Sequence, residues 1–333
     1  MYQWDKLFKG AVRIEKTPAG VIACRFTERQ LAFYASVSEM SSIRAAGGAG
    51  IRMEFITDSP EISFSYETTA FCRDSLYFDF YENGVLCGVV KEPDNSPGGS
   101  VSYRKHSAGD TRITIYFPYT CGIVLKEVSL GNVQYIEEQT VHYLALGDSI
   151  TQGMDAKHAS FNYPAILSRY FGWDYLNQGV GGFYFDPASL DADLPFRPDI
   201  ITVAYGVNDC YMISIGQKTL AEVERAVKSY MGRLRTLSPK AEIYVITPIW
   251  RTAEYEDADI ASGLRNMREL IAGEASERGF RVIDGERLVP HDSGFFGDGA
   301  LHPNEMGFLE YAMHMIPQMQ SISQKGYCIP KSI

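Results

Sequence analysis

The hydrophobic pattern of the chain changes its period near residue 132, and this change limits the possible folds. Before that point, apolar and polar residues alternate along short segments, which is the pattern of half-buried strands. These segments are residues 51–56, 61–66, 76–81, 85–90, 111–117 and 122–128. Asn83-Gly84 separates two of them and favours a two-residue hairpin turn. Because no convincing helical segment interrupts them, they predict an all-β sandwich, with a jelly roll as one form of it.

After a connector at residues 131–142, apolar strand-like runs alternate with segments of helical period. The expected strands are residues 143–146, 173–176, 199–205, 241–247 and 281–284, and the expected helices are residues 163–171, 220–234 and 260–278. Asn304 is placed to cap a last helix. This alternation predicts a parallel sheet with helices on both faces. We therefore expect two domains, residues 1–138 and residues 139–333.

Composition limits the classes of binding partner and the cellular compartment that we expect. A formal net charge of −10 gives little help in binding nucleic acid or an anionic membrane. The six cysteines form no CxxC pair, which favours free thiols in a reducing compartment. The first residues lack the apolar stretch of a signal peptide, and no run approaches the roughly 18 apolar residues of a membrane span. We expect a cytoplasmic protein; its oligomeric state is left open.

Residues 144–153, Leu-Ala-Leu-Gly-Asp-Ser-Ile-Thr-Gln-Gly, form a buried strand that stops at a tight turn. Open α/β sheets place their ligands at such carboxyl ends of strands, so Ser149 is a candidate nucleophile. A serine hydroxyl needs a base, and preferably a carboxylate that orients that base. The alternative is a strand-to-helix turn with capping residues.

The candidate base is His302, in a loop that also carries Asp298 and precedes the last helix. An isolated surface histidine is the alternative interpretation. His291, followed by Asp292, is the serious rival, and His158 is placed where it could line a cleft.

Two further loops could supply donors for an oxyanion, which requires fixed N–H groups. Residues 177–182 contain three glycines after the second strand, and glycine allows close approach of a backbone N–H to a substrate. Asn208 follows the strand at residues 199–205 and could present its side-chain amide. The pair Asn208-Asp209 could equally form a turn and a helix cap.

Taken in order, these blocks resemble the SGNH hydrolases, also called the GDSL family. The matching blocks are Gly147-Asp148-Ser149, Asn177 to Gly182, Gly206-Val207-Asn208-Asp209, and Asp298 with His302-Pro303. The resemblance implies a flavodoxin-like three-layer domain with Ser149, His302 and Asp298 as catalytic triad. It also implies an oxyanion hole formed by Ser149, Gly182 and Asn208. Asp298 and His302 stand four positions apart, whereas the family usually has three, and Asp298 is kept as the orienting acid. The N-terminal β-domain looks like that of carbohydrate deacetylases and an antibiotic-biosynthesis acyltransferase.

The function expected from this resemblance is a serine esterase for short acyl esters, above all acetyl esters, with O-acetylated carbohydrates as candidate substrates. An acyltransferase using the same serine and a non-catalytic carbohydrate-binding protein are the alternatives. Phe183, Tyr184 and Trp250 are candidates for the pocket wall, although such aromatics are more often core residues. We expect no cofactor and no metal, and a base with a pKa near the ordinary histidine value of about 6.5.

Overall fold

The computed structural model describes residues 2–137 and 139–320. Its N-terminal part contains two antiparallel sheets packed face to face. The first has the order β1-β4-β9-β6-β7, with β11 paired to β4: β1 (Phe8–Lys9), β4 (Arg52–Thr57), β6 (Leu76–Glu82), β7 (Val85–Glu92), β9 (Thr111–Tyr116) and β11 (Gln134–Tyr135). The second has the order β2-β3-β10-β5-β8: β2 (Arg13–Thr17), β3 (Gly20–Cys24), β5 (Glu61–Thr68), β8 (Gly98–Arg104) and β10 (Ile123–Ser129). The predicted β-sandwich is confirmed.

Alternation of side chains along each strand builds the core of this sandwich. Along β5, Ile62, Phe64 and Tyr66 are buried between the sheets, while the intervening serines are half-buried. At the end of β6, Asn83 and Gly84 have φ angles of 49° and 86°, which turn the chain back into β7. The predicted hairpin is therefore present, because both residues tolerate positive φ.

The expectation that this part contains no helix was wrong. It contains α1 (Trp4–Leu7), α2 (Glu28–Val37) and α3 (Glu39–Ala46). Thr27 starts α2 with a capping box, in which its hydroxyl accepts from the Gln30 N–H and its own N–H donates to the Gln30 side chain. The helical pattern was hard to see because α2 buries only Gln30 and Tyr34. Strands β2, β3 and β8 were also missed.

The C-terminal part contains a parallel five-stranded sheet of order β13-β12-β14-β15-β16. Its strands are β12 (His142–Gly147), β13 (Asp174–Gly179), β14 (Ile200–Ala204), β15 (Glu242–Ile246) and β16 (Arg281–Ile283). Numbered by their order in the chain, the strands run 2-1-3-4-5 across the sheet, which is the flavodoxin-like arrangement. The predicted fold class is confirmed.

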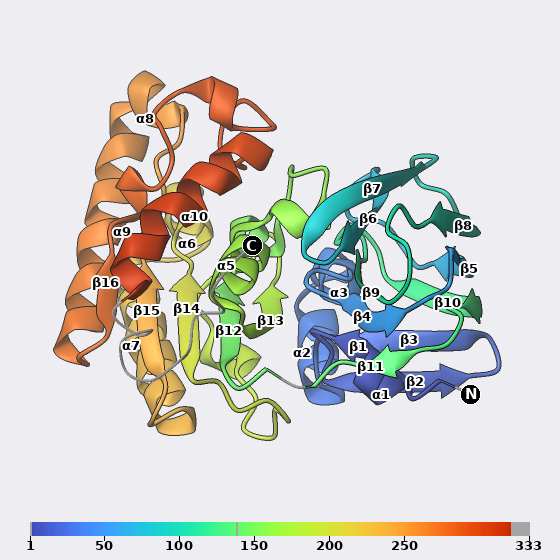
Figure 1. Ribbon diagram of the computed structural model, residues 1–333. Helices are drawn as coiled ribbons and strands as arrows, with labels where there is room; N and C mark the ends of the chain where they lie inside the picture. Colours follow the sequence, from blue (N-terminus) through green and yellow to red (C-terminus); the bar gives the residue numbers. More distant parts are fainter. Residues whose placement is uncertain (1, 138, 321–333) are drawn as a thin grey trace.

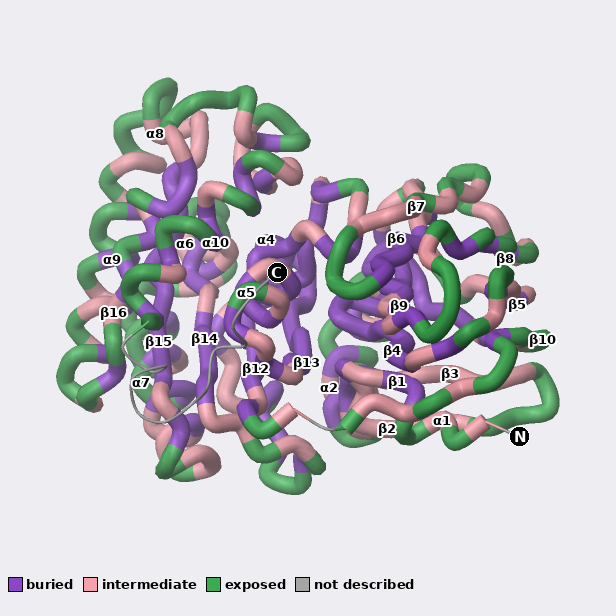
Figure 2. The backbone as a smooth tube through the Cα atoms, viewed as in Figure 1, coloured by how far each residue is buried: buried purple, intermediate pink, exposed green. Residues whose placement is uncertain are grey.

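Helices cover both faces of this sheet. On one face lie α5 (Tyr163–Phe171) and α10 (Glu305–Met319), packed on Tyr143 and Ala145 of β12. On the other lie α7 (Leu220–Leu237) and α9 (Ala258–Glu277), packed on Leu144 and Leu146. Consecutive residues of β12 thus pack against helices on opposite faces of the sheet. Figure 2 shows that the central strands are buried and that the outer helices are exposed on one side. The predicted cap of α10 is present, since the Asn304 side chain accepts from the Gly307 N–H at 3.0 Å.

Shorter elements lie in the connections: α4 (Ser149–Gln152), α6 (Val207–Ser214), α8 (Ala253–Glu256) and single 3₁₀ turns at Ala159–Phe161, Pro187–Ser189, Gly285–Arg287 and Ser293–Phe295. None of the helices that the structure describes is both long enough and apolar enough to cross a membrane. Five cysteines in the described residues are free thiols, as expected; Cys328 lies outside them.

The two parts are joined by an extensive polar contact at β13. Figure 1 shows α2 and α3 between the blue-to-cyan sandwich and the green-to-red α/β layers. The buried guanidinium of Arg25 donates to the carbonyl oxygens of Gly179 at 2.7 Å and Asn177 at 3.0 Å. Its other nitrogens donate to the carbonyls of Gly47 and Arg44, both at 2.7 Å. The sandwich therefore holds the end of β13. The domain boundary at residues 138 and 139 stays a prediction.

Candidate active site

Three strand ends lie side by side at one edge of the parallel sheet. Gly147 at the end of β12 is in register with Gly179 of β13 on one side and Ala204 of β14 on the other. The chain continues from β12 to β13 on one side and returns to β14 on the other, so the switch point, where open α/β sheets bind ligands, lies between β12 and β14 at this edge. The chain segments that carry Ser149, Gly182 and Asn208 start from these three ends.

The turn after β12 depends on close backbone packing. A Cβ at Gly147 would lie 2.0 Å from the Thr151 hydroxyl and 2.7 Å from the Ala204 carbonyl oxygen, so only glycine fits. Asp148 then caps α4 by accepting from the Ile150 N–H at 3.0 Å, and Ser149 becomes the first residue of that helix. Burial raises the pKa of the Asp148 carboxyl to about 7. The capping alternative is thus realised by Asp148, and it leaves the hydroxyl of Ser149 available for other contacts.

The hydroxyl of Ser149 meets the predicted base. His302 Nε2 lies 2.9 Å from Ser149 Oγ, and His302 Nδ1 lies 2.7 Å from Asp298 Oδ2. The structure thus brings the three predicted triad residues into one hydrogen-bonded chain. Ser149 is 5% exposed, and the side chain of His302 is 16% exposed.

The four-residue spacing between Asp298 and His302 has a local explanation. Asp298 Oδ1 accepts from the backbone N–H groups of Ala300, Leu301 and His302 at 2.9, 2.8 and 3.1 Å. Gly299 supplies the left-handed conformation, with φ of 70°, that this turn requires. One carboxylate oxygen therefore fixes the turn while the other faces the imidazole, and the extra residue is accommodated.

A second carboxylate, that of Asp155, lies next to the imidazole of His302 and was not predicted from the sequence. Asp155 Oδ2 lies 3.1 Å from His302 Nδ1, and Asp155 Oδ1 accepts from Arg73 Nε at 3.1 Å. Asp155 follows α4 by three residues in a loop that carries no recognisable spacing to the histidine. The contact arises because residues 297–302 pack against this loop in the folded protein. No motif in the sequence indicates that packing.

The two carboxylates shift the titration of the base. Burial by itself would lower the pKa of His302, but hydrogen bonds and charge attraction from Asp155 and Asp298 outweigh it and raise the pKa to about 9. Burial would likewise raise the pKa of Asp298, yet the hydrogen bonds from His302 and from backbone N–H groups hold it well below its usual range. The expectation that the pKa of the base lies near the ordinary histidine value was therefore wrong, because the two carboxylates raise it.

The two predicted oxyanion loops are held in place by side chains. Gly182 is exposed with φ of 73°, and its neighbour Gly181 donates its N–H to Gln152 Oε1 at 2.8 Å. Arg44 of α3 donates to the Gly181 carbonyl at 2.8 Å. These contacts fix the conformation of the loop that carries Gly182.

Asn208 is the second residue of α6, whose N-cap is Gly206, so the amide is not a cap. Asn208 Nδ2 donates to the Phe183 carbonyl at 2.9 Å, and a longer bond of 3.4 Å joins it to Asp148 Oδ2. The amide therefore links the loop after β13 to the nucleophile turn. Asp209, its neighbour, is fully buried and accepts from the Phe185 N–H.

The rival histidines are engaged elsewhere. His291 Nε2 lies 2.9 Å from the Glu286 carbonyl oxygen, and its ring stacks on Trp250 with 4.7 Å between centroids. His158 Nδ1 lies 2.8 Å from Asp79 Oδ1 of the sandwich. Of the histidines in the described residues, only His302 contacts Ser149.

The predicted pocket aromatics separate into two kinds. Phe183 and Trp250 are 1% and 3% exposed; Phe183 packs on Tyr34 and Trp250 on Phe296. Their burial leaves little surface for a substrate, so they are better described as packing residues. Tyr184 is half-buried, with Lys218 Nζ 3.3 Å from its ring centroid, and its contact with substrate stays a prediction.

Two groups of side chains have the proximity that a metal site needs. In each, the potential ligand atoms lie within 4.8 Å of one another: Asp155, Asp298 and His302, and separately Glu82, Cys87 and His106. The first group is satisfied by the hydrogen bonds described above. In the second, Glu82 accepts from the Tyr103 hydroxyl and from two backbone N–H groups. Glu82 is thus already engaged by three hydrogen bonds, and we assign neither group to a metal.

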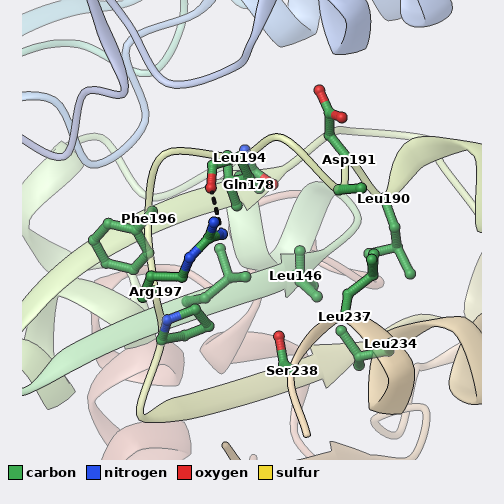
Figure 3. Close-up of a pocket in the computed structure, with 13 residues that line it drawn as sticks. Leu146, Gln178, Leu190, Asp191, Leu194, Phe196, Arg197, Leu234, Leu237 and Ser238 are labelled. Carbon is green, nitrogen blue, oxygen red and sulfur yellow. Dashed lines mark hydrogen bonds between the residues drawn. The ribbon is translucent and has the colours of Figure 1, made fainter.

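A cavity of about 40 Å³ lies away from the predicted site residues, between β12, the end of α7 and residues 190–198. Figure 3 shows its lining, with Arg197 donating to the Leu194 carbonyl. Its walls combine the apolar side chains of Leu146, Leu234 and Leu237 with polar side chains such as those of Gln178, Asp191 and Arg197. None of the triad or oxyanion candidates lines it, so this cavity is separate from the candidate active site.

The comparisons with known proteins agree with this geometry. Residues 145–308 match the model of the GDSL-like lipase/acylhydrolase family. The α/β part of the chain is a member of this family. Curated protein sequences gave no match to the chain. The GDSL region includes Ser149, Gly182, Asn208, Asp298 and His302, so the resemblance inferred from the motifs is confirmed, while the role of each residue stays a prediction.

Solved structures similar to this chain match it over both of its parts. A salicylyl-acyltransferase from a tetracycline biosynthetic pathway has a TM-score of 0.77 and 19% identity, covering 96% of each chain. A family two carbohydrate esterase from Clostridium thermocellum has a TM-score of 0.67 and 13% identity, covering 97% of this chain and 99% of that one. An acetyl xylan esterase from Butyrivibrio proteoclasticus has a TM-score of 0.59 and 15% identity, covering 84% and 91%. These likenesses establish the shared two-part fold.

Proposed function

We propose that this GDSL-family protein is a serine esterase that hydrolyses short-chain acyl esters through an acyl-enzyme. The observation that carries the proposal is the hydrogen-bonded chain from Ser149 through His302 to Asp298. A serine becomes an effective nucleophile when a base takes its proton and a carboxylate orients that base. The membership in a family of lipases and acylhydrolases supports ester chemistry at this site.

In the proposed first step, neutral His302 takes the proton of Ser149 as its oxygen attacks the ester carbonyl carbon. The negative charge that develops on the carbonyl oxygen is stabilised by the N–H groups of Ser149 and Gly182 and by the Asn208 amide. The long bond of 3.4 Å from the Asn208 amide to Asp148 is weak enough for the oxyanion to replace it.

Collapse of the tetrahedral intermediate breaks the ester bond, and His302 returns its proton to the leaving alcohol. Water then attacks the acyl-enzyme, with His302 again taking a proton. The second collapse releases the carboxylic acid and restores the Ser149 hydroxyl. His302 and Asp298 keep the same roles in both halves of the cycle.

We further propose an acetyl group as the acyl group and an acylated saccharide as the natural ester. Two similar structures, the family two carbohydrate esterase and the acetyl xylan esterase, support this choice. Tyr184, half-buried beside the Gly182 loop, is the proposed contact for the substrate. A small molecule is thus the proposed partner.

Rates on 4-nitrophenyl acetate and 4-nitrophenyl octanoate test the proposal. We expect hydrolysis of the acetyl ester to be far faster, and the Ser149→Ala variant to be inactive on both. Ser36→Ala, an exposed serine of α2, is the matched control and should keep wild-type rates. Absence of turnover in the wild-type protein would contradict esterase activity, and equal rates on the two esters would contradict the short-chain preference.

An acyltransferase is the second candidate, because the structure with a TM-score of 0.77 is an acyltransferase. It would use the same Ser149 acyl-enzyme and differ only in the acceptor. Product analysis with added alcohols or sugars separates the two activities. Transfer that outcompetes hydrolysis at millimolar acceptor would favour the acyltransferase.

A further inference from the structure

The imidazole of His302 has two carboxylates at the same nitrogen. Asp298 Oδ2 lies 2.7 Å from Nδ1, and Asp155 Oδ2 lies 3.1 Å from it. Nδ1 carries a single hydrogen, so the two acceptors share it. The side chains of Asp155 and Asp298 are 19% and 34% exposed, so Asp155 is the more shielded of the two.

Asp155 is held by contacts from both parts of the molecule. Its second oxygen accepts from Arg73 Nε at 3.1 Å, and its backbone N–H donates to the Tyr119 hydroxyl at 3.1 Å. Both partners belong to the β-sandwich side. From the other side, Gly297 packs so closely that a Cβ there would lie 2.7 Å from the Asp155 carbonyl oxygen.

The backbone of Asp155 is in the left-handed region, with φ of 68°. A residue other than glycine adopts this conformation at a cost in energy unless its surroundings enforce it, and such residues are frequent at functional sites. Here the conformation allows the carboxylate to bridge Arg73 and His302. The residue that contacts His302 and Arg73 is therefore also the one with the unfavourable backbone conformation.

We propose that Asp155 is a second positioning carboxylate for His302, and that Arg73 makes this position depend on the β-sandwich. The proposal rests on the proposed function, in which His302 is the base. When His302 accepts the Ser149 proton it becomes a cation, and each carboxylate stabilises that cation. Either one can therefore partly replace the other, and the site is less sensitive to loss of Asp298 than a triad with one acid.

The sign of each electrostatic effect follows from the charged groups that face His302. These are Asp155 in the loop after α4, Asp298 in its own loop, and Asp148 in the nucleophile turn, with Arg73 behind Asp155. Removing the charge of Asp155 lowers the pKa of His302, because an anion that favours the imidazolium is lost. Removing the charge of Arg73 has the opposite sign, because a cation near the imidazolium is lost.

The test is the pH dependence of kcat/KM on 4-nitrophenyl acetate for Asp155→Asn, Asp298→Asn, the double variant and Arg73→Gln. We expect about a tenfold loss for each single aspartate variant and about 10⁴-fold for the double variant, the loss known for a triad whose acid is replaced. The midpoint of the acidic limb should move down by about one pH unit in Asp155→Asn and up in Arg73→Gln. Asp110→Asn, an exposed aspartate bonded to Gln134, is the matched control and should leave the midpoint unchanged.

A second measurement keeps the inference separate from the proposed function. In Ser149→Ala, the imidazole of His302 can be titrated by NMR without any turnover, and Asp155→Asn in that background should lower its pKa. An unchanged His302 pKa, together with a double variant no worse than Asp298→Asn, would overturn the role of Asp155. A shifted pKa in a protein without esterase activity would instead overturn the proposed function and leave the positioning role intact.

Discussion

The two parts of the molecule contribute to the candidate site in different ways. The α/β part supplies the groups that contact one another at the proposed reacting atoms: Ser149, His302 and Asp298. The β-sandwich part supplies arginines that hold segments next to these groups. Arg25 and Arg44 bind carbonyls of residues 177–182, and Arg73 binds Asp155. The proposed catalytic residues thus lie in loops of the α/β part, and residues of the β-sandwich part help to fix the positions of those loops.

Replacing the nucleophile should give the largest effect and isolates the contribution of the α/β part. Ser149→Ala removes the acyl acceptor and leaves every contact of the sandwich in place. We expect kcat/KM on 4-nitrophenyl acetate to fall by at least about 10⁴-fold. Circular dichroism and thermal unfolding should match the wild-type protein. A variant that keeps wild-type turnover would show that another residue performs the chemistry.

The amide of Asn208 comes next in expected size. Loss of one oxyanion donor typically costs about 10²–10³-fold in kcat. Asn208→Ala should therefore lower kcat while KM changes little, because the donor acts mainly on the transition state. Steady-state kinetics with the acetyl ester measure both constants. A change confined to KM would identify Asn208 as a substrate-binding residue instead.

The contribution of the sandwich can be tested at Arg25. This buried guanidinium donates to four carbonyl oxygens, and burial lowers its pKa to about 10. Arg25→Met leaves those carbonyls without their donor, and we expect the free energy of unfolding to drop by about 2–4 kcal/mol. Urea denaturation measures the change. Arg29→Met, half-exposed and paired with Asp191, is the control and should cost under about 1 kcal/mol. Equal losses in the two variants would contradict a special role for Arg25.

The pH profile connects both parts, because Asp155 and Asp298 together raise the pKa of His302 to about 9. The base must be neutral, so kcat/KM should rise about tenfold per pH unit below that value and level off above it. Since the folded-state pKa exceeds the ordinary value of about 6.5, the stability from the charged imidazole is fully present below pH 6.5 and is lost as pH rises through about 9. A midpoint near 6.5 would show that the carboxylates do not favour the charged form.

The smallest effect is expected from metal removal. The proposed chemistry uses only side chains and backbone N–H groups, and the carboxylates at His302 are already hydrogen-bonded. Dialysis against EDTA should leave kcat/KM unchanged, and added Zn²⁺ should not restore activity to any variant. A loss on chelation that is reversed by a metal would give Asp155, Asp298 and His302 a different role.

The residues predicted from the sequence are those whose role is encoded close to them in the chain. The GDS turn, the Asn304 cap and the parallel strands follow from local pattern and period, and the structure has all of them. Asp155 and Arg25 could not be predicted, because each acts through partners distant in the chain: His302 for Asp155, and the end of β13 for Arg25. Helix α2 was missed for a related reason, since its buried Tyr34 packs against Phe183 of the other part.

The central claim is that Ser149 is activated by His302, and covalent labelling tests it most directly. A fluorophosphonate reacts with a serine whose proton is taken by a neighbouring base. Intact-mass analysis of the full chain should show one adduct, peptide mapping should locate it at Ser149, and Ser149→Ala should remain unlabelled. An unlabelled wild-type protein, or an adduct that persists in Ser149→Ala, would contradict the account.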